Sequence, residues 1–73
     1  MREFRFWIGL SREEVLDLYR GAYHRVRVRD DYGTVIEIDA DKLRAFTSES
    51  GIHGYFKLIT TDSFKFIGLT RLR

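Results

Sequence analysis

The residues that could take part in catalysis are few and lie far apart in the chain. There are two histidines, His24 and His53, and no cysteine, which excludes disulfides, thiol chemistry and zinc-finger spacing. Neither histidine belongs to a motif that would place it beside a nucleophile, and no serine has the G-x-S-x-G context of a hydrolase. A chain of 73 residues also leaves little room for a substrate pocket of a few hundred Å3. We therefore expect a protein that is not an enzyme, with no catalytic residues, metal ligands, cofactor or small-molecule substrate.

Two short motifs resemble ligand sites, but local structure explains each of them more simply. Gly51 and Gly54 have the G-x-x-G spacing of an RNA-clamping loop, yet they do not link the helices which that motif requires. The glycines instead predict a tight turn from Ser50 to Gly54. Asp30 and Asp31 are adjacent in an expected loop, with too few oxygen ligands nearby for a calcium site. We interpret both motifs as turns.

Arginines alternate with valines in the stretch H-R-V-R-V-R-D-D-Y-G-T-V-I-E-I-D, which spans residues 24–39. The alternation predicts a β-hairpin whose loop is residues 31–33, with Gly33 at the left-handed position that such loops need. This register gives two apolar pairs on the core face and two ion pairs on the other face: Val28 with Ile36, Val26 with Ile38, Arg27 with Glu37, and Arg25 with Asp39. Arg29 faces Val35 and has no ionic partner, so the hairpin neutralises most of its own charge.

The first strand and the helix after it follow from periodicity and capping. Residues 4–10 alternate like a half-buried strand, with Phe4 inward and Trp7 outward. Ser11 and Glu14 have the spacing of a capping box that starts a helix, and a glycine at position 21 is the usual helix stop. The sequence therefore predicts a strand that leads directly into a short helix.

The second half of the chain predicts a helical turn followed by two more strands. Asp41 is the expected cap of a short helical turn that ends at Phe46, and residues 55–61 alternate as a strand. The last segment, residues 64–73, has apolar residues at both parities. A bulge near Gly68 would reconcile them. The turn between these strands, within residues 61–63, has no register that the pattern can assign.

These elements predict an α+β fold in one domain that spans residues 1–73. We expect a five-stranded, mainly antiparallel and strongly bent sheet, with a partly open barrel as the alternative. One α-helix should follow the first strand, and the short helical turn should separate two hairpins. No stretch has the ~20 apolar residues of a membrane span, and no leader pattern is present. We therefore expect a cytoplasmic protein that does not bind membranes.

The sheet face that points away from the core carries the candidate binding residues. They combine cations with aromatic rings: Arg5, Trp7, Arg29, Tyr55, Lys57 and Arg71. Trp, Tyr and Arg are enriched at interface anchors, which favours a binding module for an unknown protein or for a second copy in a homodimer. A basic, aromatic face also suits single-stranded RNA, which is the alternative. Glu37 and Asp39, expected on the same face, and a net charge of only +2 count against nucleic acid.

Four motifs resemble a small bacterial family, domain of unknown function 2835, whose members are about as long as this chain. They are F-R-F at residues 4–6, Y-R-G-A at 19–22, G-I-H-G at 51–54 and K-F-I-G-L-T-R-L at 65–72. The family has no assigned activity, so the resemblance implies a bacterial, cytosolic, single-domain protein and no particular site. It also implies a small polar residue where this chain has Trp7, so Trp7 is not expected to be functional throughout the family.

Overall fold

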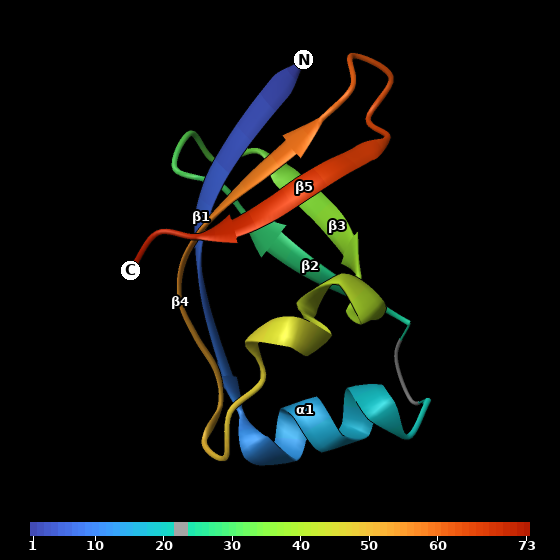
Figure 1. The fold of residues 1–73 in the computed structure, drawn as a ribbon, viewed down its shortest axis with the longest axis vertical. Helices are drawn as coiled ribbons and strands as arrows, with labels where there is room; N and C mark the ends of the chain where they lie inside the picture. The colour runs from blue at the N-terminus through green and yellow to red at the C-terminus, as the bar shows by residue number, and fades with distance from the viewer. Residues whose placement is uncertain (22–23) are drawn as a thin grey trace.

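The computed structural model of the chain describes residues 1–21 and 24–73. Ala22, the last residue of the Y-R-G-A motif, lies outside the described residues. The elements appear in the predicted order: β1 (Arg2–Ser11), α1 (Arg12–Tyr19), β2 (Arg25–Arg29), β3 (Val35–Asp39), the 3-10 helix η1 (Ala40–Phe46), β4 (Gly51–Thr60) and β5 (Phe66–Arg71). Figure 1 shows α1 and η1 toward one end of the molecule, with β1 and β4 running along its length to reach them and β2, β3 and β5 toward the other end.

The five strands form two antiparallel sheets, so the prediction of one continuous sheet is wrong. One sheet has the order β1-β4-β5, and β2 pairs with β3 in the other. The hairpin crosses behind the larger sheet in Figure 1. One backbone hydrogen bond joins the hairpin loop to β1, from Asp31 N to Arg5 O at 2.9 Å. Strand pairing does not extend from β1 to β2, so the strands do not close into a barrel.

The β2–β3 hairpin has the predicted register throughout. Val28 pairs with Ile36, Arg27 lies opposite Glu37, and the other expected pairs follow in step. Gly33 has a φ of +86° and occupies the left-handed position of the loop. The local apolar pattern and the turn residue agree, and together they determine which face of the hairpin is buried.

The capping box at the start of α1 is confirmed, but the predicted cap of the second helical segment is wrong. Ser11 Oγ accepts a hydrogen bond from Glu14 N at 3.2 Å, and Glu14 Oε1 accepts one from Ser11 N at 3.1 Å. The second helical segment is present as η1. Its cap position is occupied by Asp39, whose side chain makes no capping bond, and Asp41 lies within the first turn.

Residues 50–54 do not form the predicted turn, because β4 begins at Gly51 and pairs with the end of β1. Both glycines of G-I-H-G have positive φ, at +113° for Gly51 and +153° for Gly54. A Cβ at Gly51 would lie 2.0 Å from Leu10 O, and one at Gly54 would lie 2.6 Å from Arg73 O. The glycines therefore allow two close backbone approaches within a strand.

The bulge predicted near Gly68 is present. Ile59 pairs with Gly68 whereas Thr60 pairs with Phe66, so Ile67 is the extra residue. Because of this insertion, Phe66 and Leu69 both share the core-facing parity of β4, and Ile67 is displaced to the outward side. This explains how the last strand can carry apolar residues at both parities.

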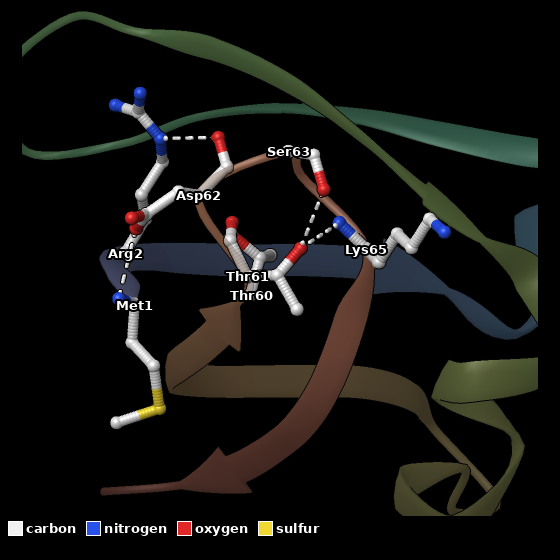
Figure 2. Close-up of polar contacts among 7 residues, drawn as sticks. All are labelled: Met1, Arg2, Thr60, Thr61, Asp62, Ser63 and Lys65. Atoms are coloured by element: carbon white, nitrogen blue, oxygen red, sulfur yellow. Dashed lines mark hydrogen bonds and ion pairs between the residues drawn. The ribbon is translucent and has the colours of Figure 1, made fainter.

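The β4–β5 turn is braced by the start of the chain and by its own hydroxyl groups. The N-terminal ammonium group lies 2.8 Å from Asp62 Oδ1, and Arg2 Nε donates to Asp62 O at 3.1 Å (Figure 2). Thr61 Oγ1 accepts a hydrogen bond from Lys65 N at 3.0 Å and lies 3.1 Å from Ser63 Oγ. These contacts tie the turn to the first residues of β1 and to the backbone at Lys65.

The core lies between the larger sheet and the elements that cover its inner face. Its fully buried side chains are Phe6, Leu43, Ile52 and Phe56. They come from β1, η1 and β4, and the inward residues of the hairpin pack against them. Even-numbered residues of β1 face this core, so its odd-numbered residues, Trp7 among them, face outward.

Candidate functional site

Trp7 is the most exposed large aromatic residue on the outward face of the β1-β4-β5 sheet. Its register partner is Tyr55 on β4, and the two ring centroids lie 4.8 Å apart with the planes tilted by 35°. Trp7 nevertheless remains 60% exposed, whereas Tyr55 is half-buried. The cross-strand contact thus fixes the orientation of the indole and leaves most of it open to solvent.

Tyr55 is held on three sides. Its hydroxyl donates a hydrogen bond to an oxygen of the Asp31 carboxylate, which reaches it from the β2–β3 loop. The guanidinium of Arg73 lies 5.5 Å from the ring centroid, and the third contact is Trp7. The hydrogen bond to Asp31 favours the protonated phenol, so the pKa of Tyr55 is raised above its ordinary value. Partial burial raises the pKa further, and the nearby arginines oppose the shift.

The cations of this face are partly neutralised. Arg5 Nε lies 2.9 Å from Glu3 Oε2, an exposed ion pair within β1. Lys57 lies opposite Arg5 in the register and is half-buried. With Asp31 against Tyr55, the face carries carboxylates as well as cations. It is therefore a mixed surface rather than a strongly basic one.

Aliphatic side chains lie at two places along β4 and β5 on the same face. Ile67, the bulge residue, is 48% exposed, and Leu72 is 39% exposed. Ile59 is half-buried near Ile67 on β4, opposite Gly68. Leu72 lies next to the aromatic pair because its N–H bonds to Tyr55 O, whereas the row of Arg5, Lys57 and Thr70 separates Ile59 and Ile67 from the rings.

The structure brings together four of the six predicted binding residues: Arg5, Trp7, Tyr55 and Lys57. Arg29 belongs to the other sheet, where its Nη1 lies 3.5 Å from Gly33 O. Arg71 lies opposite Phe56, at the core-facing parity, because the bulge shifts the register of β5. The prediction grouped these residues because it assumed one continuous sheet.

Glu37 and Asp39 also lie on the smaller sheet, where both approach Arg25, at 4.0 Å and 3.3 Å. They therefore do not occupy the face that carries Trp7, contrary to expectation.

Several residues of the face were not predicted from the sequence. Ile67 and Leu72 could have been placed there by carrying the expected bulge through the parity of the last strand. No periodic signal identified Asp31 or Arg73, because each reaches Tyr55 through tertiary contact from a loop and from the end of the chain.

The described part of the chain contains no group of three or more His, Asp or Glu residues that could hold a metal ion. His53 Nε2 lies 2.9 Å from Ser50 O and so has a structural partner, while His24 is exposed directly before β2. Among residues 1–21 and 24–73, no helix has the length and apolar character needed to cross a membrane.

The chain matches the family described as "Protein of unknown function (DUF2835)" over residues 2–72. It belongs to this family. The match covers nearly the whole chain and confirms the resemblance carried by the four sequence motifs. Comparisons with curated proteins and with solved structures found no match. Membership in DUF2835 does not assign an activity, so the function of this chain has to be argued from its surface.

Proposed function

We propose that this DUF2835 protein is a non-enzymatic binding module that contacts another protein through the outward face of β1-β4-β5. The observation that carries the proposal is Trp7, which is 60% exposed and yet oriented by its contact with Tyr55. A rigid, exposed indole beside a tyrosine and arginines has the composition of an interface hot spot. Because Tyr55 already orients the indole before a partner binds, the entropic cost of binding is lower.

The surroundings of Trp7 suit a protein better than a nucleic acid. Tyr55 has Trp7 on one side and Arg73 nearby, so it offers little free ring surface for a stacked base. Arg5 is paired with Glu3, which weakens its attraction for phosphate. Ile67 and Leu72 extend the surface with aliphatic groups, which pack well against another protein. A second copy of this chain is one such partner.

Single-stranded RNA is the second candidate, and one observation favours it. Glu37 and Asp39 lie on the other sheet, so the acidic charge expected to repel phosphates is not on this face. Arg5, Lys57 and Arg73 lie around Trp7 and Tyr55, an arrangement of cations and rings that can hold a single strand. Affinity for RNA would fall steeply with ionic strength through counterion release, whereas an apolar protein contact would respond weakly.

The test is affinity capture from a bacterial lysate with the wild type, Trp7→Ala and Tyr32→Ala, each with and without nuclease. Tyr32 is the control because it is also an exposed aromatic residue, 95% exposed, in the β2–β3 loop. We expect captured proteins that Trp7→Ala loses, that Tyr32→Ala retains and that nuclease leaves bound. Loss upon nuclease treatment would favour RNA, and equal capture by both variants would contradict a role for Trp7.

Self-association is tested in the same set of variants by sedimentation. If the partner is a second copy, the wild type should form dimers at high concentration, and Trp7→Ala should make the free energy of dimerisation less favourable by roughly 1–3 kcal/mol. A monomer at all concentrations would exclude the second copy and leave a different protein as the partner.

A further inference from the structure

The outward face of the β1-β4-β5 sheet is ordered in three rows that run across its strands. The strand register defines their members: Trp7, Tyr55 and Leu72 in the first row, Arg5, Lys57 and Thr70 in the second, and Glu3, Ile59 and Gly68 in the third. Neighbouring rows are two residues apart along each strand, a separation of about 7 Å. The face therefore presents an aromatic row, a cationic row and a row centred on Ile59, at regular spacing.

The second row contains two like charges in direct opposition. Arg5 on β1 and Lys57 on β4 are register partners, and like charges in such positions repel each other. Glu3 Oε2 lies 2.9 Å from Arg5 Nε and offsets part of this repulsion. Lys57 forms no ion pair with any residue in the ranges 1–21 and 24–73. An anionic group bound between Arg5 and Lys57 would relieve the repulsion.

The carboxylates near the cationic row are already engaged. Glu3 is paired with Arg5, and the Asp31 carboxylate accepts the hydroxyl of Tyr55. The guanidinium of Arg73, 5.5 Å from the Tyr55 ring centroid, adds a third cation beside the first row. Lys57 is thus left as the cation in the middle of the face that lacks a carboxylate of its own.

The third row has an open space at Gly68. A Cβ placed there would have no atom within 4 Å, and the φ of Gly68 is not left-handed. Neither crowding nor the backbone at the bulge therefore requires a glycine. A glycine within a strand weakens it and often marks a place where another chain approaches closely. Ile59 lies opposite this space and Ile67, 48% exposed, lies beside it, so an aliphatic side chain of a partner fits there.

We propose that the partner of this face is an extended segment of another protein with apolar, acidic and apolar residues at every second position. The inference rests on the proposed function and names the chemistry of its partner. Side chains i, i+2 and i+4 of an extended segment lying along β4 have the spacing of the three rows. One apolar side chain packs on Trp7, the carboxylate lies between Arg5 and Lys57, and the other apolar side chain occupies the space at Gly68.

The three rows fit such a segment better than a second copy or an RNA strand. Two copies can cover all three rows only if the second row of one lies on the second row of the other. That arrangement sets Arg5 and Lys57 of both copies against each other, which is unfavourable at an interface. RNA would place phosphates on the second row, but the aliphatic third row has no ring on which a base can stack.

The probe is a blocked peptide, leucine-threonine-glutamate-threonine-leucine, titrated into the full chain and followed by NMR. One control peptide has glutamine in place of glutamate, and a second has the same composition with glutamate first. We expect the probe to shift the resonances of Trp7 and Lys57 and to bind about two- to fivefold more tightly than the glutamine peptide, an advantage that shrinks in high salt. The permuted peptide should bind more weakly than the probe. No binding, equal binding of the glutamate and glutamine peptides, or tighter binding of the permuted peptide would overturn the proposal.

Variants of the chain test the second and third rows separately. Lys57→Gln should abolish the preference for glutamate over glutamine, and Lys65→Gln, the same change in the β4–β5 turn, should retain it. Gly68→Val fills the open space, so it should weaken the probe without lowering the midpoint of unfolding, because valine suits a strand. A preference that survives Lys57→Gln, or probe affinity that Gly68→Val leaves equal or higher, would overturn the proposal.

The outcomes also distinguish this inference from the proposed function. If the glutamate and glutamine peptides bind equally and both shift Trp7, the acidic pattern is wrong and contact through Trp7 stands. If capture from lysate does not depend on Trp7, the proposed function fails and this inference fails with it. Tighter binding of a uridine hexanucleotide than of the probe at the same salt concentration would assign the cationic row to RNA and overturn the proposal.

Discussion

The two hairpins close with loops of the same length and hydrogen-bond pattern but with different residues at the decisive position. In each, the residue before the loop donates its N–H to the carbonyl four residues later at 2.8 Å, and its own carbonyl accepts the N–H of the third loop residue at 3.0 Å. That third residue is Gly33 in the β2–β3 loop and Phe64 in the β4–β5 loop, with φ of +86° and +67°. A glycine reaches this conformation freely, whereas the phenylalanine is strained by about 1–2 kcal/mol.

The two loops also differ in what their tips contact: one packs against the larger sheet, and the other carries an exposed aromatic side chain. The β2–β3 loop docks onto β1 and brings Asp31 to Tyr55, so its tip belongs to the internal structure. The β4–β5 loop holds the ring of Phe64 at the rim of an open groove. The same backbone hydrogen-bond pattern thus holds a loop that packs against β1 in one hairpin and a loop that leaves an aromatic ring exposed in the other.

The largest expected difference between the loops is in the free energy of unfolding that the residue before each loop contributes through its side chain. Asp30 is buried, and its Oδ1 accepts hydrogen bonds from Tyr32 N at 3.0 Å and Thr34 N at 2.7 Å. Thr61 Oγ1 accepts one such bond, from Lys65 N. Asp30→Ala should lower the free energy of unfolding by about 2–3 kcal/mol, and Thr61→Ala by about 1 kcal/mol. Urea unfolding measures both losses.

The control for this prediction is Asp30→Asn, which keeps one side-chain oxygen as an acceptor. It should recover about half of the stability that Asp30→Ala loses. Equal losses for Asp30→Ala and Thr61→Ala would show that the two loops are stabilised to the same extent.

The third loop position gives the next largest effect and tests whether the two loops are equivalent. Gly33→Ala should destabilise the protein by about 1 kcal/mol, because the added Cβ disfavours positive φ. Phe64→Gly and Phe64→Ala both remove the ring, so their comparison isolates the backbone, and the glycine variant should be more stable by about 1 kcal/mol. Thermal or urea unfolding gives both differences. No difference at position 64 would mean that the phenylalanine is not strained there.

Features set by neighbouring residues could be predicted from the sequence. The β2–β3 register follows from alternation around Gly33, the helix start follows from Ser11 and Glu14, and the bulge follows from conflicting apolar parities around Gly68. The division into two sheets could not be predicted, because no local sequence pattern indicates whether β1 and β2 form a strand pair. The glycines of G-I-H-G were misassigned because positive φ can serve a close approach as well as a turn.

The same limit applies to the candidate site. Trp7 and Tyr55 could be placed on one face from parity alone, and the structure brings their rings together. Arg29 was misplaced with the sheet division, and Arg71 with the bulge. Asp31 could not be assigned, since its contact with Tyr55 depends on how the hairpin packs against β1.

A smaller effect concerns the ion pairs of the β2–β3 hairpin, which have no counterpart between β4 and β5. Arg27 Nη2 lies 3.6 Å from Glu37 Oε2, and both side chains are exposed. A double-mutant cycle with alanine should show favourable coupling of about 0.2–0.5 kcal/mol that weakens in high salt. The matched cycle on Lys57 and Thr70, which are paired across β4 and β5, should show no salt dependence. Salt-independent coupling at Arg27 and Glu37 would contradict an electrostatic origin.

The smallest expected effect on stability comes from the first residue of each loop, which is Asp31 in the β2–β3 loop and Asp62 in the β4–β5 loop. Asp31 accepts the hydroxyl of Tyr55, whereas Asp62 pairs with the N-terminus. The pKa of Tyr55 is raised in the folded state. The hydrogen bond to Asp31 therefore stabilises the protein fully at any pH below the unfolded tyrosine pKa of about 10. This stabilisation is lost as the pH rises through the pKa of Tyr55 in the folded protein. Absorbance titration should show one tyrosine ionising late, and Tyr55→Phe should remove that step. Asp31→Asn should return Tyr55 toward its ordinary pKa while Asp62→Asn leaves it unchanged; an equal response to both variants would mean that the hairpin loop does not control Tyr55.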